Sequence, residues 1–150
     1  MKQGSGYRGY VSSRPFLGER VPQHVQNLVI RNYCTQNNLS FLLSSVEVVM
    51  PNTYMILETL LEQLDDLEGI VCYSMFQLHH EKKLRMKVYD TILSKNRSVH
   101  FAVEGLRIFD YQDVARIDNI MCVKKTMFDA LSSDALRKGM EVAESRRNIT

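Results

Sequence analysis

GYRGYVSSRP, residues 6–15, combines a short strand with the polar turn that ends it. The strand is expected over residues 7–12, and the turn carries two hydroxyls and a guanidinium, from Ser12, Ser13 and Arg14. In an open α/β sheet, the turn after the first strand lies at the carboxyl end of the sheet, where ligands usually bind. This stretch therefore predicts a ligand site at that end, without indicating a reaction.

Outward from this stretch, strand and helix signals alternate along the chain. Strands are predicted over residues 7–12, 39–46, 69–76, 98–103 and 120–123. Helices are predicted from Pro22 to residue 37, from an N-cap at Asn52 to Leu64, over residues 80–95, over residues 110–117 and from about residue 127. Because strands and helices alternate at intervals of about 30 residues, we expect βαβ units and a parallel sheet.

The predicted fold class is α/β, a three-layer, open, mostly parallel sheet of four to five strands with helices on both faces. The first helix is expected to bury one apolar face, formed by Val21, Val25, Leu28, Val29 and Tyr33. We expect a flexible lead over residues 1–6, a single domain over residues 7–145 and a frayed end over residues 146–150.

Composition favours a soluble cytoplasmic protein. The 150 residues are 45% apolar and 24% charged, with a net charge of +2 that implies no polyanionic partner. No apolar run approaches the roughly 20 residues of a membrane helix, so we expect no membrane insertion. Cys34, Cys72 and Cys122 are odd in number and lie in apolar segments, which favours buried free thiols.

The chain lacks the usual signatures of cofactor sites. No pair of cysteines has metal-ligand spacing, so we predict no metal site. Neither common glycine-rich phosphate loop is present, which argues against a Rossmann-type cofactor and leaves any cofactor unassigned.

Polar residues lie at or just after the ends of four of the predicted strands, and these are the candidate site residues. The candidates for catalysis are Ser12, Glu47 and Glu104, and the candidates for ligand binding are Ser13, Arg14, Tyr73, Ser74 and Gln77. A guanidinium fork matches phosphate or carboxylate groups, so Arg14 is expected to hold an anionic group. Arg8 and Arg20 have the same chemistry, but we interpret both as surface residues.

The histidines admit two interpretations. His79 and His80 are adjacent at a helix start and point in different directions, so we do not assign them to a site. His100 shares a strand face with Glu104, which suits either acid–base chemistry or a hydrogen-bonded core histidine. We favour the core interpretation.

Five segments resemble the small proteins of bacterial "sporadic carbohydrate clusters". They are GYRGYVSSRP, ERVPQHVQNLVIRNYC, MPNTYMILETLL, GIVCYSMFQL and HFAVEGL, which lie between residues 6 and 106. Such proteins are encoded among genes for surface polysaccharides such as the lipopolysaccharide O-antigen. The resemblance implies a role in carbohydrate biosynthesis, but no catalytic residues to carry over.

The segment YVSS, residues 10–13, also resembles the catalytic domain of serine recombinases, the resolvases and invertases. That resemblance implies a resolvase-like fold and places the nucleophile of the family at Ser12. However, Tyr10 stands where the family has an arginine, and residues 73–80 lack its paired arginines. Phosphoryl transfer without those cations loses its main electrostatic stabilisation, so we expect the fold without the DNA chemistry.

Three functions follow from these observations. The first is an enzyme or binding protein of surface-sugar biosynthesis, acting on a phosphorylated or nucleotide-activated sugar. The second is a non-catalytic scaffold or sensor that forms a homo-oligomer through its last helix. The third, which we disfavour, is a resolvase-like DNA-acting protein.

Overall fold

A five-stranded sheet forms the centre of the protein. The computed structural model describes residues 5–16, 18–47 and 54–147, without the side chains of residues 132 and 135. The strands are β1 (Tyr7–Ser12), β2 (Phe41–Glu47), β3 (Gly69–Cys72), β4 (Ser98–Phe101) and β5 (Leu106–Ile108). Their order is β2-β1-β3-β4-β5, with β1 to β4 parallel and β5 antiparallel to β4. The prediction of a mostly parallel sheet is therefore confirmed.

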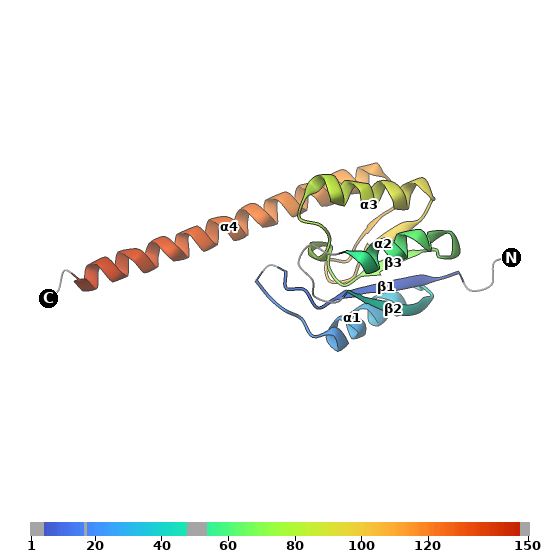
Figure 1. The fold of residues 1–150 in the computed structure, drawn as a ribbon, viewed down its shortest axis with the longest axis horizontal. Helices are drawn as coiled ribbons and strands as arrows, with labels where there is room; N and C mark the ends of the chain where they lie inside the picture. Colours follow the sequence, from blue (N-terminus) through green and yellow to red (C-terminus); the bar gives the residue numbers. More distant parts are fainter. Residues whose placement is uncertain (1–4, 17, 48–53, 148–150) are drawn as a thin grey trace. The chain divides into compact units, whose positions relative to one another are not determined.

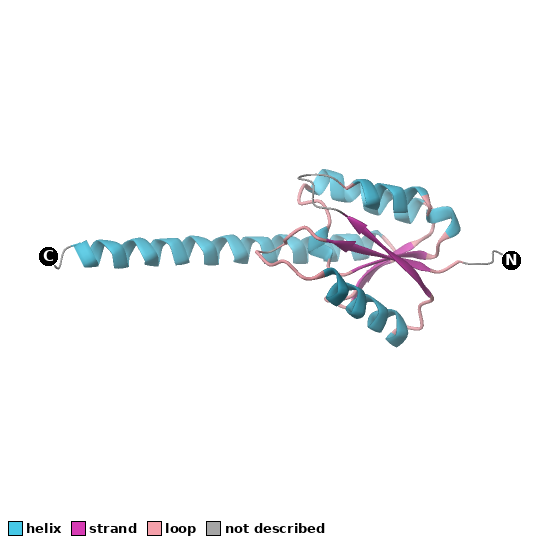
Figure 2. Ribbon diagram, turned by 60° about the horizontal axis from the view of Figure 1, so that its bottom comes forward, coloured by secondary structure: helices cyan, strands magenta, loops and turns pink. Residues whose placement is uncertain are grey.

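Helices cover both faces of the sheet, which confirms the predicted three-layer α/β fold. The helices α1 (Gln23–Gln36), α2 (Met55–Glu62) and α3 (Lys82–Ser94) connect successive parallel strands. Figures 1 and 2 show α1 on one face and α2 with α3 on the other. Two short 3₁₀ turns, η1 (Leu64–Asp66) and η2 (Met75–Gln77), complete these connections.

The central strands β1 and β3 are almost entirely buried, and most of their side chains are apolar. Val11 in β1 and Val71 in β3 are fully buried, and Ile30 and Cys34 of α1 pack in the same core cluster. Such a continuous apolar character is typical of parallel strands covered by helices. Burial of these side chains is the main favourable contribution to the stability of this fold.

The buried face of α1 differs from the prediction. Leu28 is 65% exposed, and the residues of α1 that are buried are Gln26, Ile30 and Cys34. These three positions are spaced by four residues and therefore share one helix face. A glutamine takes the place of an apolar residue there because its amide is fully hydrogen-bonded, as described below. In α2 the buried residues are Leu57 and Leu60, whereas the predicted N-cap, Asn52, lies outside the described residues.

The prediction of a fifth strand over residues 120–123 is wrong. Those residues lie within α4, one continuous helix over Tyr111–Arg147 that replaces the two predicted helices and the strand between them. Four consecutive apolar residues suit a buried strand or a helix, and no turn residue interrupts the helical pattern here. The fifth strand is instead β5, which returns along β4 after a turn at Gly105, whose φ of 62° suits glycine.

Two strands end earlier than predicted. β3 ends at Cys72 instead of residue 76, and β4 ends at Phe101 instead of residue 103. After β3, Ser74 begins η2 and takes the backbone into a tight turn. Met75 and Phe76 of this turn are apolar, so hydrophobicity alone does not distinguish them from strand residues.

The chain divides into two compact units, Met1–Ala115 and Arg116–Thr150, and the division falls within α4. The first unit contains the sheet. In the described part of the second unit, large apolar side chains are exposed along the helix, at Val123, Met127, Phe128, Leu131, Leu136, Met140 and Val142. Among the described residues, no helix is both long and apolar enough to cross a membrane.

Candidate functional site

Four turns meet at the carboxyl end of the parallel strands. Ser12 and Glu47 end β1 and β2, Ser74 follows β3, and Glu104 follows β4. The strand order reverses between β1 and β3, because β2 lies on one side of β1 and the later strands on the other. In open α/β sheets, ligands bind outside the strand ends at such a switch point. The edge formed by these turns is therefore the candidate site.

Gln26 of α1 is the hub of a buried hydrogen-bond network at this edge. Its Nε2 donates to the backbone oxygen of Ser12 (2.7 Å), and its Oε1 accepts from the backbone N–H of Ser12 (3.2 Å). The same Oε1 accepts from Nε2 of Gln77 (2.7 Å), and Nε2 also donates to the oxygen of Val21 (2.8 Å). Gln26 thus ties α1 to the end of β1 and to η2.

The turn after β1 is held by its two serines. The hydroxyl of Ser12 is buried and accepts a hydrogen bond from the backbone N–H of Arg14 (3.1 Å). The hydroxyl of Ser13, which is partly exposed, donates to the backbone oxygen of Glu47 (3.2 Å). Ser12 therefore shapes the turn that presents Arg14, while its assignment as a catalytic residue stays a prediction.

Arg14 projects its partly exposed guanidinium over the switch point. Nη2 donates to the hydroxyl of Tyr10 (3.2 Å) and to the backbone oxygen of Gln77 (3.4 Å), and both acceptors are neutral. The guanidinium carbon lies 3.9 Å from the centre of the Tyr54 ring, which is a cation–π contact. Groups from β1, η2 and the residue before α2 therefore fix the position of this cation.

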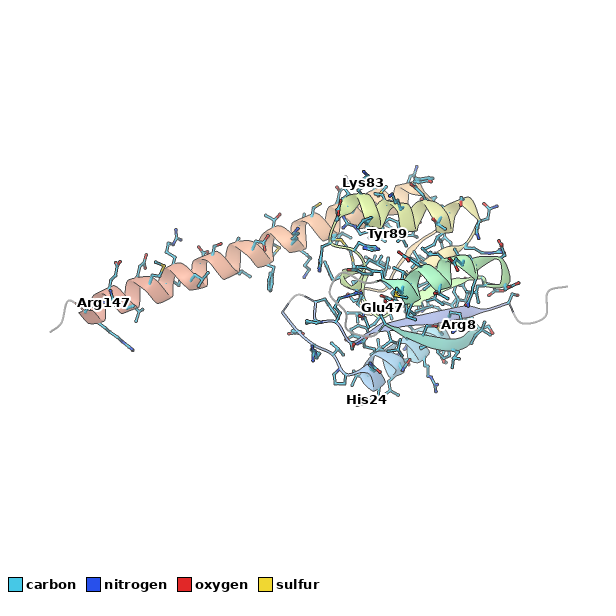
Figure 3. The ribbon with its side chains drawn as sticks, viewed as in Figure 1. Arg8, His24, Glu47, Lys83, Tyr89 and Arg147 are labelled. Atoms are coloured by element: carbon cyan, nitrogen blue, oxygen red, sulfur yellow. The ribbon has the colours of Figure 1, made fainter. Side chains whose placement is uncertain are left out.

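Glu47 is buried at the end of β2, next to the start of α2 (Figure 3). Its Oε2 accepts from the backbone N–H groups of Ile56 (3.0 Å) and Leu57 (3.2 Å) and from the hydroxyl of Tyr10 (3.2 Å). A carboxylate at a helix N-terminus satisfies free N–H groups and interacts favourably with the helix dipole. Glu47 thus caps α2, and a catalytic role for it stays a prediction.

Burial keeps the Tyr10 hydroxyl neutral and available to Glu47 as a donor. Desolvation and, next, the Glu47 charge raise the pKa of Tyr10 above its usual value, although Arg14 acts in the opposite direction. The hydroxyl accepts from Arg14 and donates to Glu47, so it connects a cation and an anion.

Ser74, Gln77 and Glu104 form the part of the network after β3 and β4. Ser74 caps η2: its hydroxyl accepts from the N–H of Phe76 (3.2 Å), and its own N–H donates to Oε1 of Gln77 (3.2 Å). The Ser74 hydroxyl donates to Oε1 of Glu104 (2.5 Å), whose Oε2 accepts from the N–H of Met75 (3.4 Å). Glu104 therefore holds the turn after β3 in place.

Tyr73, the remaining predicted residue, packs against the loop that follows β1. Its ring meets Phe16 edge-on, with 6.0 Å between ring centres. Partial burial, then the charges of Glu104 and Glu19, raise the pKa of the Tyr73 hydroxyl. Tyr73 is partly exposed and stays a predicted ligand contact.

Two residues that we did not assign from the sequence join this edge. The rings of Tyr54 and His79 are stacked at a tilt of 37°, with 3.6 Å between their centres. Burial, then the charges of Arg14, Arg85 and His80, lower the pKa of His79. The adjacent histidines were visible in the sequence, but the contact with Tyr54 joins residues 25 positions apart and left no local signal.

His100 is a core histidine, as predicted. Its Nδ1 is 2.8 Å from the Tyr33 hydroxyl and its Nε2 is 3.3 Å from the Ser98 hydroxyl. Burial and then the charge of Arg107 lower its pKa to about 4. His100 is therefore neutral at pH 7, and its hydrogen bonds are structural.

Arg8 lies in β1 and is held by β2. Its Nε donates to the backbone oxygen of Leu43 (3.0 Å), and its Nη2 donates to the Ser45 hydroxyl (2.7 Å). The register of β1 and β2 shifts at this point. Arg8 therefore supports the irregular part of the sheet, whereas Arg20 is exposed, as expected.

The edge offers the Arg14 guanidinium, the His79 imidazole, the Tyr54 ring and the Ser13 hydroxyl, a set suited to an anionic ligand with a polar ring. Within the described ranges, no group of three or more His, Cys, Asp or Glu side chains is placed to hold a metal ion. No family model, no curated protein and no solved structure matches this chain. The two family resemblances therefore stay predictions.

Proposed function

We propose that this protein binds a phosphorylated or nucleotide-activated sugar at the carboxyl edge of its sheet, as part of bacterial surface-polysaccharide biosynthesis. The polysaccharide setting rests on the resemblance of the five sequence segments. The ligand class rests on the site itself, where a cation and aromatic groups lie at the switch point of an α/β sheet.

The position of Arg14 over Tyr54 is the observation that carries this proposal. A guanidinium can bind phosphate oxygens through two parallel hydrogen bonds, which a flexible ammonium group does less well. The contact with the ring and the bonds to Tyr10 and Gln77 hold the guanidinium in one orientation before a ligand arrives. Such preorganisation reduces the entropy lost on binding.

For two of the three candidates for catalysis, the geometry favours a structural role over a catalytic one. Ser12 is 1% exposed and Glu47 is 2% exposed, so neither presents its side chain to a ligand. Both are also engaged in bonds that shape the turn and cap α2. The partly exposed groups at this edge are instead Ser13, Arg14 and Tyr73, which were predicted to bind a ligand, together with His79.

A thermal-shift screen tests this proposal. The probes are nucleotide diphosphosugars, sugar 1-phosphates, inorganic phosphate, the neutral parent sugars and duplex DNA. A ligand at about 100 times its dissociation constant stabilises the folded state by about 2.7 kcal/mol. For a domain of this size, that corresponds to a rise in Tm of about 5 to 10 °C.

We expect a shift with phosphorylated sugars and none with neutral sugars. Arg14→Met keeps the packing on Tyr54 but removes the charge, so it is expected to abolish the shift. Arg20→Met removes an exposed charge from the same loop region and should leave the shift unchanged. Equal shifts with neutral sugars, or a shift that survives Arg14→Met, would contradict the proposal, as would tight binding of DNA.

A scaffold that self-associates through α4 is the second candidate function, and the exposed apolar side chains favour it. Val123, Met127 and Leu131 are spaced by four residues, and each is more than half exposed. An exposed row of this kind is typical of an interaction surface. A second copy of this chain is the partner we infer, because basic and acidic pairs alternate along the helix, at Lys124, Lys125, Asp129, Asp134, Arg137, Lys138, Glu141 and Glu144.

Two such helices in antiparallel orientation would bring the basic pair 124–125 near the acidic residues 141 and 144. Sedimentation over a range of concentrations tests this inference, against a monomer mass of 17.4 kDa. We expect a larger species that is lost in the double variant Met127→Gln/Leu131→Gln. Leu28→Gln, which changes an exposed leucine of α1, is the matched control and should associate like the wild type. A monomer at all concentrations would exclude the scaffold.

A further inference from the structure

His79 is a partly exposed imidazole at the candidate site, and the rest of the network does not use its ring nitrogens. Among the residues that the structure describes, neither nitrogen has a hydrogen-bond partner. This contrasts with His100, where both nitrogens lie within hydrogen-bond distance of hydroxyls. The ring of His79 is instead fixed by stacking on Tyr54, the residue that also contacts Arg14.

The backbone around His79 is held as firmly as its ring. Arg85 of α3 is buried, and its Nη1 donates to the backbone oxygens of His79 (3.0 Å) and His80 (3.2 Å). At the other end of this short segment, the oxygen of Gln77 accepts from Arg14 (3.4 Å). Arg14 and His79 are therefore positioned by the same segment, residues 77–80, and by the same aromatic ring.

We propose that His79 is a second contact for the phosphate group of the ligand, and that the ligand binds together with one proton taken up by His79. This inference rests on the proposed function, because it assigns a role at the Arg14 site. The proton comes from the solvent and stays on the imidazole, which then donates an N–H to a phosphate oxygen. No covalent bond forms or breaks.

The charges around His79 explain why the proton arrives only with the ligand. Arg14 from the β1 turn, Arg85 from α3 and the neighbouring His80 all disfavour a further positive charge, and partial burial acts in the same direction. The buried Glu47 of β2 also lies at this edge, next to Tyr54, but Tyr10 and the α2 amides already bind its carboxylate. A ligand with two negative charges outweighs these positive charges, so it favours the protonated imidazole and raises the pKa of His79.

The sign of the pH dependence follows from this shift. The pKa of His79 lies below its usual value of 6.5 in the free protein and is higher in the complex. Between these two values, the complex holds more protons than the free protein, so binding strengthens as the pH falls. For one linked proton, the dissociation constant decreases by at most about tenfold for each pH unit.

Titration calorimetry with uridine diphosphoglucose tests the proposal, because the two charges of this probe do not titrate between pH 5.5 and 8. Measurement in buffers of different ionisation enthalpy gives the number of protons taken up. We expect close to one proton per ligand between the two pKa values, and tighter binding at lower pH. His79→Gln keeps a hydrogen-bond donor but cannot be protonated, so its proton uptake should vanish and its affinity should become independent of pH.

His24→Gln is the matched control, since His24 is exposed on α1 and is not among the charges that act on His79, and it should behave like the wild type. Equal melting temperatures of the variants would establish that each is folded. Inorganic phosphate is the second probe; because it titrates in this pH range itself, only the part of its proton uptake that His79→Gln removes would assign the effect to the phosphate group. Binding without proton uptake, or uptake that persists in His79→Gln, would overturn the role of His79 and leave the Arg14 site intact. No binding of either probe would overturn both.

Discussion

The carboxyl edge of the sheet and the helix of the second unit depart from the usual distribution of side chains in opposite ways. At the edge, polar and charged side chains such as Gln26, Glu47 and Gln77 are buried. Along residues 123–142 of α4, apolar side chains such as Leu131 and Met140 are more than 60% exposed. Buried polar groups and exposed apolar surfaces are the two arrangements that report on function, because each costs free energy unless it has partners.

The difference between the two regions lies in where the partners come from. At the edge, the partners are supplied by the same unit, since Gln26 alone makes four hydrogen bonds there. This internal satisfaction leaves a rigid frame from which Arg14 and His79 are presented. On the second unit, the large apolar side chains along residues 123–142 are exposed, and a partner for them would have to come from outside this chain. This difference is the reason why we propose ligand binding at the edge and self-association through the helix.

The largest expected effect is the loss of the Gln26 network. Gln26→Ala removes the partners of the Ser12 backbone groups, of the Val21 oxygen and of the Gln77 amide. Each buried polar group left without a partner is costly, so we expect unfolding to become easier by about 3 to 5 kcal/mol. Chemical denaturation monitored by circular dichroism measures this change.

Gln36→Ala is the control on the same helix, because Gln36 is exposed at the end of α1. It should change the free energy of unfolding by less than about 0.5 kcal/mol. A Gln26→Ala variant as stable as Gln36→Ala would mean that the buried network does not stabilise the edge, and the comparison would fail.

The second effect is a loss of stability in acid that arises from His100. Its folded pKa of about 4 lies below the usual 6.5, so the unfolded chain binds the proton more readily. The folded state is therefore destabilised as the pH falls from 6.5 to 4, by about 3 kcal/mol in total. His100→Asn cannot titrate in this range, so the wild type should lose more stability than the variant by that amount. Parallel losses in both proteins would show that His100 does not titrate with a lowered pKa.

The smallest effect is expected on the second unit. The double variant Met127→Gln/Leu131→Gln should change the free energy of unfolding by less than about 0.5 kcal/mol at concentrations where the protein is monomeric, since both side chains are exposed. At high concentration the Tm of the wild type should rise and that of the variant should not, because association stabilises the folded state. A large loss of stability in the dilute variant would mean that these side chains are packed within one chain.

Local patterns predicted much of the fold. The apolar runs identified β1 to β4, and their alternation with helices predicted a parallel sheet. The rule that ligand sites lie at strand ends placed Ser12, Glu47, Ser74 and Glu104 at one edge. The same patterns failed over residues 120–123, where four apolar residues fit a strand or a helix equally well. Hydrophobicity is a local property, and it does not distinguish these two states in so short a run.

Three residues of the site were not predicted from the sequence. Gln26 comes from α1, Tyr54 from the residue before α2, and His79 from the turn before α3. None of them follows a strand directly, so the rule that found the other residues did not apply to them. Their approach to Arg14 depends on how the helices pack on the sheet.

By itself, the sequence determined the alternation of strands and helices, the burial of the central strands and the presence of polar turns at their ends. These features depend on residues a few positions apart, through hydrophobic period and turn chemistry. Only the tertiary structure decided that Gln26 replaces an apolar side chain in the core, that Glu47 caps α2, and that Arg14 and His79 contact one ring. Those contacts join residues far apart in the chain. They form, and contribute to stability, only when the helices pack on the sheet.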